Sequence, residues 1–277
     1  MTFVNSVLGV VFDGLLYPFR GFHPLVGLAL VSLLTALVML PVIKYTSDQK
    51  KLEAVKRKIH ASLFEIRLFN DNVRAILRAL FDIVRHNGTY LWLWLVPLLW
   101  LIAPLVLTVA QLQFNYGYRG LEPGETTLLE VRLDEERYGG ADKPNVQLTA
   151  PSGVVVDTPA VWSPVEAELT WRLRAEDWGE GDLELTIDGE PATKNIQVSE
   201  VTKRRSPIRT KPGFMDQLLY PAEAPLAAAS AVESIEIVYP PGDAGVGIES
   251  ELTWMLVFFA LSLVFALMLR GPMGVTF

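Results

Sequence analysis

The chain contains no cysteine and only three histidines among its 277 residues. Without cysteine there are no disulfide bonds and no thiolate ligands for a metal, so redox chemistry does not indicate a compartment. The histidines, His23, His60 and His86, are too scattered along the chain to suggest a metal cluster. We also find no catalytic constellation and no internal repeat. The sequence therefore predicts a protein that is not an enzyme and that requires no cofactor.

Charged residues are missing from three long apolar runs. None of the segments 25–43, 91–112 and 252–269 contains Lys, Arg, Asp or Glu. Each is close to the ~20 apolar residues that cross the hydrocarbon core of a bilayer. One such run could be a buried helix of a soluble domain, whereas three runs favour membrane spans. The predicted spans cover residues 24–43, 90–113 and 251–270.

The first segment, residues 1–23, lacks the basic start and the small-residue cleavage site of a signal peptide, so we expect it to be retained. Residues 3–19 are apolar but interrupted by Asn5, Ser6, Gly9 and Asp13. This pattern favours an amphipathic helix that lies along the membrane interface. A short fourth span is the competing interpretation.

Charge is distributed unevenly between the segments that separate the spans. Residues 44–88 carry ten basic and five acidic side chains, a net charge of +5, whereas residues 113–250 carry twelve basic and twenty-four acidic ones, a net charge of −12. Basic residues near span ends stay on the cytoplasmic side. We therefore expect the loop 44–89 and the tail 271–277 in the cytoplasm, and the N-terminus and the segment 114–250 outside. The expected location is the plasma (inner) membrane of a bacterium.

The basic loop has the apolar periodicity of two amphipathic helices. Apolar residues recur every three or four positions at Leu52, Val55, Ile59, Leu63 and Ile66, and again between 73 and 84. The sequence FNDN at 69–72 favours a turn, with Asp71 or Asn72 as the cap of the second helix. We therefore predict a cytoplasmic helical hairpin that buries both apolar stripes on each other. Its basic outer face comprises Lys50, Lys51, Lys56, Arg57 and Lys58.

Three interpretations of this basic face remain open. It is most simply a solvated face that also fixes the orientation in the membrane. It could instead attract anionic lipid headgroups, at ~1 kcal/mol for each basic residue near the surface. The third interpretation is a sequence-independent contact with ribosomal RNA, which no interleaved aromatic residues support. No specific nucleic-acid sequence is expected as a partner.

The acidic segment changes to short alternating runs typical of strands, such as TTLLEVRL at 126–133 and EAELTWRLRA at 166–175. Their length and spacing predict an all-β, Ig-like antiparallel sandwich within 114–250. Trp171 is the expected core aromatic. Residues 207–230 break the alternation and predict a long loop with one helical turn at 215–220. We expect the basic cluster KRRSPIR, at 203–209, to pair with neighbouring acids; an anionic partner is the alternative.

Polar residues inside the spans form a second candidate site. Pro97, Pro104 and Gln111 are spaced by seven and share one helix face, with Thr108 nearby, and Ser32 and Thr35 form a similar pair in the first span. Prolines free carbonyl groups, so this face should not point at lipid tails. The default interpretation is that these residues hold neighbouring helices together through close packing and hydrogen bonds. The functional alternative is a partly wet groove.

The passage MLPVIKYTSDQKKLEAVKRKI, residues 39–59, and the order of spans, hairpin and outside domain resemble the YidC/Oxa/Get insertase superfamily, in its three-span branch. The resemblance covers about residues 24–112 and 251–270. It implies an insertase or membrane chaperone in which a basic hairpin and a polar groove ease a hydrophobic segment into the bilayer. The implied groove residues are Ser32, Thr35, Thr108 and Gln111.

Two features depart from that family: the spans contain no positively charged groove residue, and a β-domain stands between the second and third spans. The alternative function is a non-catalytic membrane-anchored scaffold whose β-domain binds an envelope or partner protein. The expected partners are the lipid bilayer, hydrophobic client segments or partner membrane proteins, and the ribosome.

Overall fold

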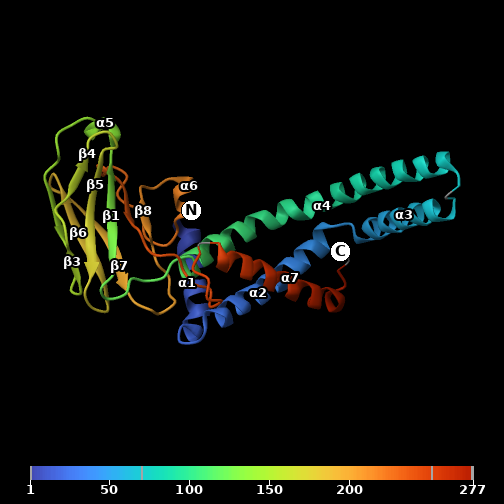
Figure 1. Ribbon diagram of the computed structural model, residues 1–277, viewed down its shortest axis with the longest axis horizontal. Coiled ribbons are helices and arrows are strands. Elements are labelled where there is room, and N and C mark those ends of the chain that lie inside the picture. The colour runs from blue at the N-terminus through green and yellow to red at the C-terminus, as the bar shows by residue number, and fades with distance from the viewer. Residues whose placement is uncertain (1, 70, 251, 276–277) are drawn as a thin grey trace. The chain divides into compact units, whose positions relative to one another are not determined.

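The computed structural model describes residues 2–69, 71–250 and 252–275. Residue 70 of the predicted turn, residue 251 at the predicted start of the third span and residues 276–277 of the predicted tail lie outside this description. The chain divides into two compact units. One comprises residues 1–27 and 107–257, and the other residues 28–106 and 258–277. The β-strands belong to the first unit, and the helical hairpin belongs to the second (Figure 1).

Three helices of the described chain are long and apolar enough to cross a membrane, as the sequence predicts. They are α2 (Pro24–Thr46), α4 (Val73–Tyr116) and α7 (Thr253–Met273), with mean hydropathies of 2.6, 2.3 and 2.0 in their most apolar windows. Runs of Leu, Val and Ala with few helix breakers explain why these segments are helical. In apolar surroundings a helix also satisfies its own backbone hydrogen bonds.

The helix α4 is unbroken over 44 residues, although the sequence predicts a hairpin arm ending near Gly88 and a separate span from residue 90. At 1.5 Å per residue it is about 66 Å long. Pro97 and Pro104 lie inside it without ending it. The second arm of the hairpin and the second apolar span are therefore one continuous element.

The hairpin begins with α3 (Gln49–Leu68), and the first part of α4 returns in the opposite direction (Figure 1). Asp48 caps α3, since its Oδ1 accepts a hydrogen bond from the backbone N–H of Lys51 at 3.0 Å. Asn72 caps α4 by accepting from the backbone N–H groups of Arg74 and Ala75 at 3.1 and 3.2 Å. Of the two caps predicted for the second arm, Asn72 is the one observed. Caps of this kind satisfy backbone donors that the helix leaves free.

The N-terminal helix α1 (Thr2–Leu16) is followed by the 3₁₀ turn η1 (Tyr17–Phe19). With 15 residues it is about 22 Å long, shorter than the ~30 Å hydrocarbon core. The Asn5 Nδ2 group donates a hydrogen bond to the carbonyl of Gln217 in the short helix α6 (Phe214–Leu219). A Cβ at Gly9 would collide with the guanidinium of Arg204. Glycine thus permits α1 to lie close against the strand-containing part of the first unit, residues 117–250, which we call the β-rich unit.

The β-strands form two antiparallel sheets. The larger sheet has the order β3-β5-β1-β9-β8, with β4 also paired to β5, and the smaller has the order β2-β6-β7. The larger sheet consists of β1 (Thr126–Leu133), β3 (Val154–Val156), β4 (Val161–Ser163), β5 (Glu168–Ala175), β8 (Ile208–Thr210) and β9 (Val232–Ile237). The smaller consists of β2 (Val146–Thr149), β6 (Gly179–Ile187) and β7 (Glu190–Val198).

Side chains from both sheets share one hydrophobic core among the described residues. In β1, Leu129, Val131 and Leu133 alternate inward and are fully buried, as expected for a strand with one face on the core. Trp171 of β5 is 3% exposed, which confirms it as a core aromatic. The antiparallel β-region separate from the apolar helices is also confirmed.

The segment 207–230 differs from its prediction in one respect. The expected helical turn is present as α6, but the first residues form the short strand β8, which pairs with β9. A three-residue strand shows no alternation long enough to be recognised. The three-residue strand β4 was not predicted for the same reason. A further short helix, α5 (Glu135–Tyr138), follows β1.

Candidate functional site

The polar pair on α2 lies one helical turn apart, and its members differ in burial. Ser32 is fully buried, and its Oγ donates a hydrogen bond to the carbonyl of Phe258 in α7 at 3.3 Å. Thr35 is half-buried. The Ser32 contact is of the kind that holds helices together in an apolar environment. The structure thus gives Ser32 a packing role between α2 and α7.

The polar pair on α4 has a different character. Thr108 is half-buried, whereas Gln111 is 1% exposed. Within the described chain the Oε1 atom of Gln111 has no hydrogen-bond partner, and the indole Nε1 of Trp254, at the start of α7, also has none. Buried polar groups are rarely left unpaired, because desolvation without a hydrogen bond costs free energy. Gln111 and Trp254 therefore have an acceptor atom and a donor atom that the described chain leaves without hydrogen bonds.

The face of α4 that carries Pro97 is more buried than its other faces in the same stretch of helix. Pro97 is buried, while Trp92, Leu98 and Trp100 are largely exposed. The exposed side chains are apolar and suit contact with lipid. Pro97 and Gln111 are both buried and Pro104 is half-buried, while the absence of lipid tails from this face stays a prediction.

The end of α2 is joined to the end of α7 beside the base of the hairpin. The Lys44 ammonium donates a hydrogen bond to the carbonyl of Met273 at 2.7 Å. A cation at this position satisfies a carbonyl left free at the helix end and interacts favourably with the helix dipole. Leu40, Ile43 and Val275 form a small hydrophobic cluster there. These contacts fix the point from which α3 departs.

The five predicted basic residues of the hairpin all lie on α3, and four of them, Lys50, Lys51, Arg57 and Lys58, are exposed, while Lys56 is half-buried. Lys51 pairs with Asp48 at 3.0 Å, and Arg57 pairs with Glu53 at 2.6 Å. The hydrogen bond from Arg57 to Glu53 raises the pKa of the Arg57 guanidinium. These are local pairs along one helix, worth only tenths of a kcal/mol when exposed.

The apolar stripes of the hairpin are buried only in part, since Ile59, Ile66, Ile76 and Ile83 are half-buried. Leu52, Val55 and Ala79 are buried. Towards the turn, however, large apolar side chains are at least 46% exposed: Leu63, Phe64, Leu68, Phe69, Val73, Leu77, Leu80 and Phe81. We call this set the apolar tip.

Two small residues on the arms of the hairpin are buried. Ser62 on α3 and Ala79 on α4 are equally distant from the turn, and both are buried, at 7% and 0% exposed. Their burial is what we expect if the two arms approach each other at these small side chains. His60, Leu63, Phe64, Ile66 and Arg67 line a hollow of about 410 Å³ on α3.

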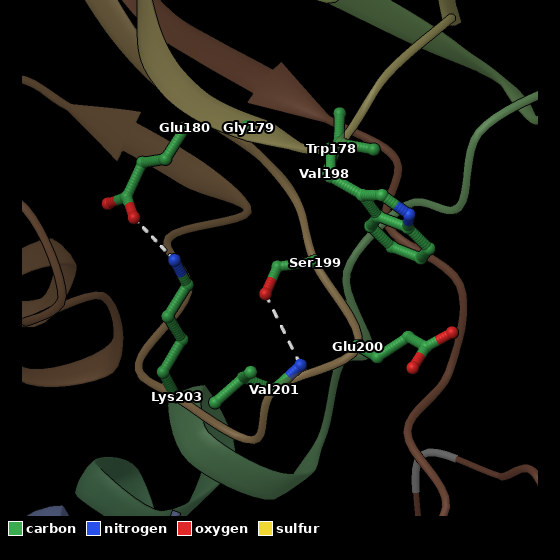
Figure 2. A pocket seen from close by; sticks show the side chains of 8 residues that line it. All are labelled: Trp178, Gly179, Glu180, Val198, Ser199, Glu200, Val201 and Lys203. Carbon is green, nitrogen blue, oxygen red and sulfur yellow. Dashed lines mark hydrogen bonds and ion pairs between the residues drawn. The ribbon is translucent and has the colours of Figure 1, made fainter.

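The basic cluster at 203–209 is built into the β-rich unit. Lys203 pairs with Glu180, as predicted (Figure 2). The arginines instead donate mainly to backbone carbonyls, which corrects the expectation of acid partners. Arg205 is 2% exposed and donates to the carbonyls of Tyr118, Ser199, Val201 and Lys203. Burial lowers the pKa of Arg205 to about 10.

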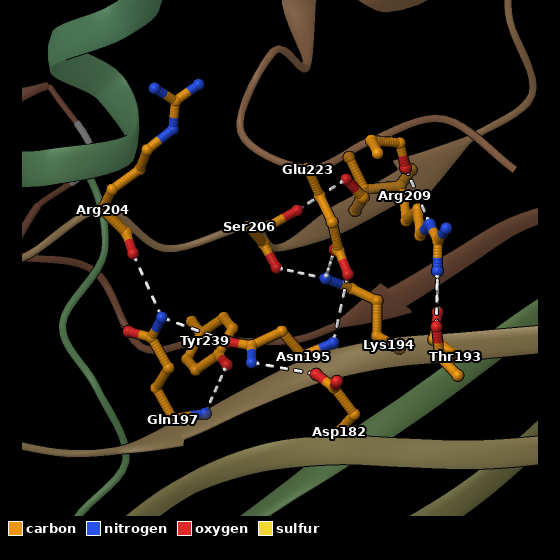
Figure 3. Close-up of polar contacts among 12 residues, drawn as sticks. Asp182, Thr193, Lys194, Asn195, Gln197, Arg204, Ser206, Arg209, Glu223 and Tyr239 are labelled. Carbon is orange, nitrogen blue, oxygen red and sulfur yellow. Dashed lines mark hydrogen bonds and ion pairs between the residues drawn. The ribbon is translucent and has the colours of Figure 1, made fainter. Parts of the chain in front are cut away.

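A buried ion pair lies beside this cluster and was not predicted. The Lys194 ammonium is fully buried and donates to Glu223 at 2.7 Å and to the carbonyl of Ser206 at 2.5 Å (Figure 3). Burial lowers the pKa of Lys194, and the nearby Glu223 carboxylate opposes that shift. Glu223 also accepts from the Asn195 backbone N–H at 3.2 Å. These contacts hold the segment after α6 against β7.

Among the described residues there is no group of His, Cys, Asp or Glu that could hold a metal ion. The candidate functional features are the apolar tip, the basic residues in the first half of α3 and the unpaired polar atoms of Gln111 and Trp254. Comparisons with protein family models, with curated proteins and with solved structures gave no match to this chain.

Proposed function

We propose that the protein is a membrane protein insertase or membrane chaperone, as its resemblance to the YidC/Oxa/Get superfamily implies. In this proposal the hairpin and the C-terminus are cytoplasmic, and the β-rich unit, an Ig-like sandwich, lies outside a bacterial plasma membrane. The observation that carries the proposal is the apolar tip, exposed at the end of an unbroken helix that continues into an apolar span.

The length of α4 supports a position of the tip in water, outside the lipid, if the apolar part of the helix spans the bilayer. The hydrocarbon core takes up ~30 Å of the helix, and residues 73–90 extend it by about 26 Å. The apolar tip would then stand clear of the headgroups. By contrast, Lys50 and Lys51 lie in the first turn of α3, close to the end of α2, where anionic headgroups are within reach.

A large apolar surface in water favours an apolar partner. Exposed apolar patches mark interaction sites, because covering them releases about 25 cal/mol for each Å² removed from water. A hydrophobic client segment that is on its way to the bilayer has a matching surface. In the spans, the unpaired Oε1 of Gln111 and Nε1 of Trp254 are buried near the outside ends of α4 and α7, so they could bind backbone groups of a client only after the helices separate.

Insertion into proteoliposomes tests this proposal. The full-length protein should increase the protease-protected fraction of a short-tailed membrane protein, and Phe64→Ser with Phe81→Ser should reduce that increase severalfold, because both side chains belong to the apolar tip. Val165→Ser, at an 84% exposed apolar residue of the β-rich unit, is the matched control. Equal insertion with and without the protein would exclude an insertase.

A membrane-anchored scaffold is the second candidate. It is favoured by the separate core of the β-rich unit, to which α1 adds a further contact. It predicts that the full-length protein retrieves one specific envelope protein from detergent-solubilised membranes, and that insertion is unaffected by its depletion. Loss of insertion on depletion would count against this alternative.

A further inference from the structure

A hollow of about 490 Å³ opens on the β-rich unit where the turn between β5 and β6 faces the segment that follows β7 (Figure 2). Its wall on one side is the indole of Trp178, which is 48% exposed. Figure 2 shows Lys203 and Glu180 across the hollow from the indole, Ser199 and Val201 between the two sides, and Glu200 on the side of the indole. Neither the proposed insertase function nor the apolar tip accounts for this site.

The floor of the hollow is held rigidly from beneath. The buried Arg205 donates to the carbonyls of Ser199 at 2.9 Å and Val201 at 2.6 Å. Ser199 Oγ accepts from the Val201 backbone N–H at 3.2 Å. At Gly120, a Cβ would lie 2.2 Å from the carbonyl oxygen of Ser199, so glycine is needed for this close approach. A preorganised floor lowers the entropy cost of binding.

The Trp178 side of the hollow is also anchored. The backbone N–H groups of Glu176 and Asp177 donate to the carbonyl of Gly153 at 2.8 and 3.2 Å. The backbone N–H of Trp178 donates to the Asp177 carboxylate at 2.8 Å. The indole is therefore a large apolar ring presented to solvent from a fixed turn. Tryptophan in such a position is typical of binding sites.

The charges that line the hollow leave one negative charge unbalanced. Lys203 and Glu180 neutralise each other in an ion pair. Glu200 is exposed and forms no ion pair with any described residue, and its carboxylate lies on the same side of the hollow as the indole (Figure 2). The segment 113–250 as a whole has a net charge of −12, from twelve basic and twenty-four acidic residues. The local and the overall charge both favour a cation.

We propose that the Trp178–Glu200 hollow binds a lysine or arginine side chain of a partner polypeptide. The indole face attracts the cation, the Glu200 carboxylate accepts its hydrogen bonds, and Val201 contacts the apolar stem that both basic side chains possess. The volume exceeds what a single ammonium group fills, so neighbouring residues of the partner also have space. This proposal does not depend on the insertase function.

Binding of a fluorescent tetralysine peptide to the full-length protein in detergent, followed by anisotropy, tests the proposal. Trp178→Ala and Glu200→Gln should each weaken binding at least threefold, whereas Trp178→Phe should weaken it less. Glu184→Gln is the matched control, because Glu184 is an exposed carboxylate of β6 that forms no ion pair with any residue the structure describes. It should leave the affinity unchanged.

The same assay distinguishes a lysine site from general acidic attraction and from lipid or glycan binding. Equal loss with Glu184→Gln and Glu200→Gln would mean general attraction to an acidic surface and would overturn the site. Equal binding of an acetylated tetralysine peptide, which has lost its side-chain charges, would overturn the cation. Displacement of the peptide by millimolar choline would reassign the site to a lipid headgroup, and displacement by neutral oligosaccharides would reassign it to a glycan. Either displacement contradicts the proposal.

Discussion

At the scale of single residues, two charged side chains that hold segments of the β-rich unit together are buried. No local sequence pattern predicts this burial. Arg205 and Lys194 look like ordinary surface residues in the sequence, yet they are 2% and 0% exposed. Arg205 binds three carbonyls within six residues and that of the distant Tyr118, and Lys194 binds the carboxylate of Glu223, 29 residues away. The pairing predicted for the cluster at 203–209 therefore holds for Lys203 but not for Arg205.

Removing one member of the buried pair should destabilise the protein strongly. Glu223→Gln leaves the Lys194 ammonium buried without its counter-charge, and we expect a loss of about 3 kcal/mol in the free energy of unfolding. Urea unfolding of the full-length protein, followed by near-ultraviolet circular dichroism, measures it. Glu233→Gln, at an exposed position of β9, should change the value by less than about 0.5 kcal/mol. Equal effects would contradict a stabilising role for the pair.

At the scale of elements, a long periodic pattern predicts a helix or strand well, whereas a single glycine is a poor guide to where a helix ends. The strand predicted at 126–133 is β1 with the same bounds, because alternation over eight residues defines it. Gly88 indicates the end of a hairpin arm in the sequence, but α4 continues through it. One glycine costs only about 1 kcal/mol in a helix, which the flanking residues offset. The periodicity of the hairpin sequence could not show which of its apolar side chains would stay exposed.

The burial of Ser62 and Ala79 on the two arms of the hairpin gives a prediction for this element. Ala79→Leu inserts a large side chain at a fully buried position and should destabilise the hairpin by about 1–3 kcal/mol. Faster amide hydrogen exchange along α3 would report this change. Leu77→Ala, at a 62% exposed residue of the apolar tip, should leave exchange nearly unaltered. Unchanged exchange in Ala79→Leu would show that the arms do not meet there.

At the scale of the whole molecule, the opposite charges of the two long segments determine the proposed orientation. The segment 44–88 has a net charge of +5, and 113–250 has one of −12. The three apolar helices are common to sequence and structure. The candidate groove is less predictable, because burial of Gln111 without a partner for its Oε1 depends on packing between helices.

The absence of cysteine allows a direct test of this orientation. In intact cells, a cysteine introduced at Lys58 should be protected from a membrane-impermeant maleimide, and one at Glu184 should react if the outer surface is accessible. Both positions are exposed, so burial does not interfere. Each variant contains a single cysteine because the natural chain has none. The reverse labelling pattern would contradict a cytoplasmic hairpin.

Site-specific photocrosslinking to ribosome-bound nascent membrane proteins tests the proposed function most directly. A photoreactive residue at Phe64 of the apolar tip, and another at Gln111, should capture the hydrophobic segment of the nascent chain, and a third at the exposed Val165 should not. Longer nascent chains should shift the crosslinks from Phe64 to Gln111. Crosslinks from Phe64 and Gln111 that reach only the protein's own helices would contradict a client-handling role.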